Sequence, residues 1–287
     1  MTSPISLSDY KICQVQLTAF VPTSKPPLPK SMAQQTFGNA LSECDSVKHF
    51  AEKIYRLHET HIPGRARPEE YWVHDVSVIK QCFHVQHEAL VFEIRHTPLV
   101  AGEHEVPFFL LVDRTIFGSS LSPGRRSDDQ VIYSPTRLEP PCSTSIWQLR
   151  STDQGSNLAI NTVQLAVLLK SVVDHAPLYN AFKHNCFWFT YVTTRLISIL
   201  FNHNEPNVVD QQDHKCPCFR RGKFFLFRIG AATQEDITGI EQRYHQYFNN
   251  VCYCLKRVST ALIFCLASTG SLVSSCRIVH PYTILRL

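Results

Sequence analysis

Alternation of apolar and polar residues along short stretches of the chain predicts β-strands. Apolar side chains occupy every second position in residues 11–21 and again in residues 88–95, which is the period of a half-buried strand. A second apolar run, at 108–113, follows a polar loop that contains proline and glycine. We therefore expect 88–95 and 108–113 to form an antiparallel pair of strands.

Apolar residues at three- and four-residue steps predict four helices, which span 45–58, 162–174, 185 or 186 to 201, and 234–257. Asn161 suits the N-cap of the second helix, and Gln164 follows three residues later, as in a capping box. The third helix is apolar nearly all round, so we expect it to be buried.

Clusters of proline and polar residues divide the chain into parts. Four prolines between residues 22 and 30 predict a stiff linker, and the Ser-, Pro-, Gly- and Arg-rich stretch 118–141 predicts a long exposed loop. A polar loop at 202–222 precedes a predicted strand at 224–229. We expect three segments: an N-terminal strand and proline-rich segment at 1–42, an α+β domain at 43–230, and a C-terminal helix and tail at 231–287.

The composition narrows the classes of function. The chain has 287 residues, 44% hydrophobic and 18% charged, with a formal net charge of +4 and no Lys/Arg run that could follow a phosphate backbone; this argues against a nucleic-acid partner. Its 11 cysteines are an odd number without regular spacing. The first residues resemble no secretory signal, and glycosylation sequons are absent. These features favour free thiols in the cytoplasm.

The uncharged stretch 258–276 has about the length that spans a bilayer. It contains eight hydroxyl or glycine positions, among them Ser268, Thr269 and Gly270, and these make insertion unfavourable. The sequence therefore favours a buried strand or an irregular tail over a membrane anchor.

Cys186 is the candidate nucleophile of this chain. A cysteine attacks as its thiolate, and a helix N-terminus favours that negative charge through unpaired N–H groups and the helix dipole. Asn185 is a suitable N-cap, which places Cys186 at the first helical position. The alternative is a small buried cysteine that only packs.

His87 is the candidate base, because it begins a predicted strand and shares a face with the small Ala89. If the two strands are joined by a loop centred near Ala101, paired positions sum to about 202, so Ala89 faces Asp113 and His87 lies diagonal to it. Asp113 is then the candidate group that orients the imidazole. The alternative for Asp113 is an ion pair with Arg114 or a cap at the strand end.

The order of these residues resembles a known superfamily. A strand that opens with His87-Glu88-Ala89, a second strand, and a helix that opens with Asn185-Cys186-Phe187-Trp188-Phe189 resemble the circularly permuted papain-like proteins, which include the lecithin–retinol acyltransferase-like and PPPDE peptidase families. The resemblance covers roughly residues 70–201 and is strongest to fungal proteins with an Asn-Cys-aromatic-Trp-Phe step. It implies a small antiparallel sheet packed against helices.

The resemblance also implies residue roles and a chemistry. Cys186 would be the nucleophile, His87 the base, and Asp113 the third polar residue, where the acyltransferase branch has a second histidine. Glu88 and Ala89 stand where the acyltransferases usually have an aromatic residue and a glycine. The implied function is a cofactor-free thiol hydrolase or acyltransferase that acts on a peptide, isopeptide or lipid acyl bond, with a protein or lipid as substrate.

Two other classes remain as alternatives. The first is a non-catalytic interaction protein that keeps the same fold. The second is a metal-binding module built from His214, Cys216, Cys218, Cys252 and Cys254. The Cys-x-Cys spacing is tighter than structural zinc sites prefer, and two residues in a predicted helix point away from each other at that spacing. The sequence therefore predicts no metal site.

Overall fold

The computed structural model describes residues 44–60, 66–81, 87–96, 107–116, 126–138, 143–150, 158–180, 183–201, 209–210, 223–224, 227–228 and 232–268. The predicted strand at 11–21 and linker at 22–30 lie outside these residues. The chain divides into two compact units, residues 1–248 and 249–287. The first half of the C-terminal helix therefore belongs to the same unit as the sheet.

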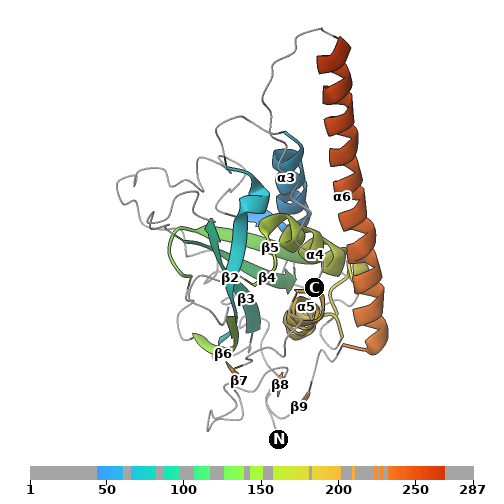
Figure 1. Ribbon diagram of the computed structural model, residues 1–287. Helices are drawn as coiled ribbons and strands as arrows, with labels where there is room; N and C mark the ends of the chain where they lie inside the picture. The colour runs from blue at the N-terminus through green and yellow to red at the C-terminus, as the bar shows by residue number, and fades with distance from the viewer. Residues whose placement is uncertain are drawn as a thin grey trace, which may run out of the picture. The chain divides into compact units, whose positions relative to one another are not determined.

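Seven antiparallel strands form one sheet in the order β1-β5-β4-β3-β2-β6-β7 (Figure 1). Their bounds are β1 Cys44–Ser46, β2 Tyr71–Gln81, β3 His87–His96, β4 Phe108–Ile116, β5 Ser127–Ser134, β6 Ser143–Arg150 and β7 Val209–Asp210. The strands predicted at 88–95 and 108–113 are confirmed as the antiparallel pair β3 and β4. The strand predicted at 224–229 is instead a small hairpin of β8, Lys223–Phe224, and β9, Phe227–Arg228.

The four predicted helices are all present: α3 Val47–Glu59, α4 Thr162–His175, α5 Cys186–Phe201 and α6 Gln234–Ser268. The capping box of α4 is confirmed. The Gln164 N–H donates to Asn161 Oδ1 at 2.9 Å, and the Asn161 N–H donates to Gln164 Oε1 at 2.9 Å. Both bonds satisfy N–H groups that the first turn of a helix leaves unpaired.

Helices α3, α4 and α5 pack together and against the sheet (Figure 1). Helix α5 contacts β3 and β4, α4 contacts β2, and α3 contacts β5. The strand positions on the α5 side include four fully buried apolar residues, Leu90, Phe92, Leu110 and Val112. The chain is thus an α+β fold with an antiparallel sheet packed against helices, as the hydrophobic pattern predicted.

Two predictions about chain segments are wrong. The stretch 118–141 was predicted to be an exposed loop, but it contains β5, in which the polar Asp129 is buried because Arg114 of β4 pairs with it. The tail after residue 257 was predicted to be a strand or irregular, but α6 continues to Ser268, because a residue that extends an existing helix adds a hydrogen bond without the cost of a new nucleus. None of the helices in the described part of the chain is both long and apolar enough to span a bilayer.

A buried ion pair fixes α5 to the sheet. The Lys80 Nζ lies 3.6 Å from Glu88 Oε1 across β2 and β3, and both side chains are 0% exposed. The Thr190 hydroxyl of α5 donates to the other oxygen, Glu88 Oε2, at 2.9 Å. Lys80 Nζ also lies 5.0 Å from the centre of the Phe187 ring. These two charges are tolerated away from water because they compensate each other and because Thr190 and Phe187 of α5 contact them.

Removal of one member of this pair should destabilise the fold strongly. In Glu88→Ala the Lys80 charge stays buried without its partner, and we expect the free energy of unfolding to fall by about 3 kcal/mol. Chemical denaturation measures this change. The control is Arg95→Ala, which breaks a 2.5 Å pair with Glu93 at a side chain that is 44% exposed, and should cost less than about 1 kcal/mol. Equal losses in both variants would contradict this role of the buried pair.

Candidate active site

Cys186, His87 and Asp113 lie together at one site. The His87 Nε2–H donates to Asp113 Oδ1, and Cys186 lies near enough to the His87 ring that its charge and hydrogen bonding raise the pKa of His87. Because Nε2 is bonded to Asp113, Nδ1 is the ring nitrogen available to the sulfur. The structure therefore brings together all three residues that the sequence singled out, from β3, β4 and the start of α5.

The register of β3 and β4 explains the His87–Asp113 contact. The pairs run from Leu90 with Val112 to Ile94 with Phe108, so their numbers sum to 202 as predicted. This register places Asp113 diagonal to His87 at the end of the sheet. Ala89, the small residue on the same face as His87, lies in a buried cluster with Ile79, Val91, Phe109 and Leu111.

The N-terminus of α5 presents Cys186 as its first residue. The Trp188 N–H donates to the Asn185 side-chain Oδ1 at 3.0 Å, and the Phe189 N–H donates to the Asn185 carbonyl at 3.0 Å. Asn185 is thus the N-cap, as predicted. The N–H groups of Cys186 and Phe187 precede these bonds and have no acceptor within the helix, so they lie where negative charge is favoured.

His87 is poised to carry a positive charge. Burial lowers the pKa of His87. The charges of Asp113 and Cys186 and the hydrogen bonds to both raise this pKa by more than burial lowers it, so it lies well above the ordinary 6.5. The His87 side chain is 14% exposed and Asp113 is 3% exposed. A buried carboxylate that holds a protonated imidazole beside a thiol is the arrangement that thiol nucleophiles use.

Arg114 is a further charged residue near Cys186, His87 and Asp113. The alternative partner for Asp113, Arg114, instead pairs with Asp129 of β5, with 3.6 Å between Nε and Oδ1. The Arg114 guanidinium lies over α5, 5.5 Å from the Trp188 ring centre. Its Nη2 donates to the carbonyls of Ala176 and Leu178, in the segment between α4 and α5.

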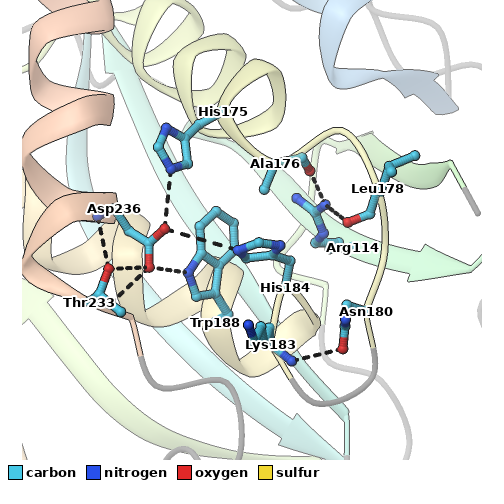
Figure 2. A network of polar contacts seen from close by, with 10 residues as sticks. All are labelled: Arg114, His175, Ala176, Leu178, Asn180, Lys183, His184, Trp188, Thr233 and Asp236. Atoms are coloured by element: carbon cyan, nitrogen blue, oxygen red, sulfur yellow. Dashed lines mark hydrogen bonds and ion pairs between the residues drawn. The ribbon is translucent and has the colours of Figure 1, made fainter. Parts of the chain in front are cut away.

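The first turn of α6 holds the segment that precedes Cys186 (Figure 2). Asp236 accepts from the Trp188 indole N–H at 3.5 Å and from His175 Nε2 at 3.2 Å, and it lies 4.0 Å from His184 Nε2. Burial raises the pKa of Asp236, but hydrogen bonds from Thr233, His175 and Trp188 lower it more, so the net pKa is below its ordinary value. Asp236 therefore stays charged and ties α6 to α5.

Sequence reasoning missed Arg114 and Asp236 as parts of this region. His175 and His184 lie half-buried beside Asp236. The one local signal was Thr233 three residues before Asp236, which forms a capping box: the Asp236 N–H donates to the Thr233 hydroxyl at 3.1 Å, and the Thr233 N–H donates back to Asp236 at 2.8 Å. That signal marks a helix start and carries no information on the partner helix.

In the described part of the chain, no group of three His, Cys, Asp or Glu side chains could hold a metal ion. Of the five residues weighed as a metal site, Cys252 and Cys254 lie within α6, and His214, Cys216 and Cys218 lie outside the described residues.

Comparison with known proteins identifies no relative. No protein-family model, curated protein or solved structure matches the chain. The site therefore has to be interpreted from its own geometry.

Loss of the Asp113 charge should lower the pKa of His87. In Asp113→Asn the largest cause that raises this pKa is removed while burial remains, so NMR titration of the imidazole should show a lower value. The folded-state pKa is raised above 6.5, so in the unchanged protein this pair stabilises the fold fully below pH 6.5 and less as the pH rises through the folded-state value. His58, which pairs with Glu69 at 2.8 Å, is the internal control. An unchanged His87 titration would contradict the assigned cause.

Proposed function

We propose that this protein is a thiol-dependent hydrolase or acyltransferase of the permuted papain-like type, with Cys186 as nucleophile. The observation that carries the proposal is that Cys186, at the N-terminus of a buried helix, lies beside His87, which donates a hydrogen bond to Asp113. The chain order supports the permuted type, because the histidine strand precedes the cysteine helix.

The geometry supports acyl transfer in two steps. The Cys186 thiolate attacks an acyl carbon and forms an S–C bond, and the N–H groups of Cys186 and Phe187 stabilise the oxygen anion. The intermediate collapses to a thioester as His87 gives its proton to the leaving nitrogen or oxygen. Water, or a second acceptor, then loses a proton to His87 and attacks the thioester, which restores the thiolate. Asp113 holds the imidazole throughout.

The proposed substrate is a protein or a lipid. Its acyl bond is a peptide, an isopeptide or a lipid ester, because a thiolate with an imidazole partner attacks the acyl carbon of each. The chemistry described uses no cofactor. Cys186 is a free thiol, and a reducing compartment such as the cytoplasm keeps such a nucleophile active.

One observation favours a second candidate, a non-catalytic interaction protein on the same fold. Cys186 is only 4% exposed, which is common for cysteines that merely pack. The two candidates differ in whether the thiol reacts, so a reactivity measurement separates them.

Thiol reactivity gives a direct test because accessibility and chemistry predict opposite orders. Cys44 is exposed, Cys252 is partly buried and Cys186 is buried; exposure alone ranks Cys44 first. Partial burial of the sulfur and the charges of Asp128, Asp45 and Asp113 raise the pKa of Cys44, which slows its alkylation. We expect iodoacetamide at neutral pH to modify Cys186 at least about tenfold faster than Cys44, as mapped by mass spectrometry.

The control variant for this test lacks the base, His87. His87→Ala should abolish the preference for Cys186, because the imidazole that stabilises the thiolate is gone. The reactivity of Cys44 and Cys252 should stay the same. Equal alkylation of the three cysteines in the unchanged protein would reject the enzyme and leave the interaction protein.

A further inference from the structure

Arg114 is a buried cation whose charge is only partly compensated. Its side chain is 0% exposed, and its carboxylate partner Asp129 lies at 3.6 Å from Nε, longer than a hydrogen bond. The Nη2 group donates to the carbonyls of Ala176 and Leu178. Within the described part of the chain, Nε and Nη1 have no hydrogen-bond acceptor. A second negative charge nearby would therefore be stabilised.

The position of Arg114 directs its charge toward the start of α5. Arg114 follows Asp113 on β4, so its side chain points to the opposite face of the sheet. There its guanidinium carbon lies 5.5 Å from the Trp188 ring centre and 6.0 Å from that of Phe189. These rings belong to the same first turn as Cys186. Burial lowers the pKa of Arg114, whereas the charges of Asp129, Tyr179 and Cys186 raise it, so Cys186 lies within electrostatic reach of the guanidinium.

We propose that Arg114 is a positioning residue that stabilises the thiolate form of Cys186 through its buried positive charge, and this inference rests on the proposed function of Cys186 as a nucleophile. The hydrogen bonds to the two carbonyls fix the guanidinium under the segment between α4 and α5. Asp129 holds the other side of the group and weakens its field at the sulfur. His87 and Arg114 thus supply two positive charges near Cys186, from β3 and from β4.

The other charged groups packed around this region are accounted for by contacts within the fold. Asp113 is bonded to His87, Lys80 is paired with Glu88, and Asp236 is bonded to α5 and to α6. Burial and the neighbouring Arg114, His175 and Lys183 lower the pKa of His184, whereas the charge of Asp236 raises it. Arg114 is therefore the group that provides positive charge on the β4–β5 side of Cys186, because its pairing with Asp129 compensates that charge only in part.

Charge changes at Arg114 and Asp129 should shift the reactivity of Cys186 in opposite directions. The rate of iodoacetamide alkylation of Cys186 is measured across a pH series, with Cys252 as internal reference. Arg114→Gln removes the positive charge and should slow the reaction about tenfold at mildly acidic pH and move the profile to higher pH. Asp129→Asn keeps the hydrogen-bonding shape, removes the opposing charge and should speed the reaction about threefold.

A purely structural role predicts a different pattern. Arg114→Lys keeps the charge but loses the paired carbonyl contacts, and we expect it to react within about threefold of the unchanged protein. If Arg114 only held the fold, Lys and Gln would slow the reaction alike, and Asp129→Asn would also slow it or leave it unchanged. Either pattern would overturn the inference.

The outcomes also separate this inference from the proposed function. Cys186 without preferential reactivity in the unchanged protein rejects the nucleophile itself. Preferential reactivity that Arg114→Gln and Asp129→Asn shift in the same direction rejects only the role of Arg114. If Arg114→Gln does not fold, as judged by circular dichroism, Asp129→Asn decides alone: a faster reaction supports the role, and a slower or equal one overturns it.

Discussion

The pairing of β3 with β4 in one register brings His87 and Asp113 to the same end of the sheet. A slip of one residue would turn every side chain to the opposite face and separate the imidazole from its carboxylate. The apolar positions on both faces hold this register, because Leu90 and Val112 are buried under α5 while Ala89 lies in the second cluster. The hydrophobic core and the site thus depend on the same alignment.

The packing of helix α5 against the sheet is the second requirement of the site. Its apolar surface buries it against β3 and β4, which places its N-terminus beside His87. The polar groups that meet it are then removed from water, and each has a specific partner: Glu88 for Thr190, and Asp236 for Trp188. Electrostatic interactions act strongly in such a site, so a small number of charges can control the state of one thiol.

The sequence predicted the elements with strong local patterns. The caps at Asn161 and Asn185, the β3–β4 register and the diagonal placement of His87 and Asp113 follow from capping, periodicity and turn arithmetic. The pairing of Cys186 with His87 was expected from the resemblance to the permuted papain-like proteins. The strand β5 was missed because its polar residues resemble those of a loop. The buried Asp129 of β5 accepts from Ser127 and pairs with Arg114 on another strand. Long-range ion pairs of this kind leave no local pattern, and for the same reason Arg114 and Asp236 were not found.

The proposed chemistry requires a thioester at Cys186. Incubation with an activated acyl ester, p-nitrophenyl acetate, followed by intact-mass analysis and peptide mapping measures it most directly. We expect one acetyl group on Cys186 that hydroxylamine removes, a much smaller amount in His87→Ala, and none in Cys186→Ala. Acetylation of the exposed Cys44 with Cys186 unmodified would contradict the account.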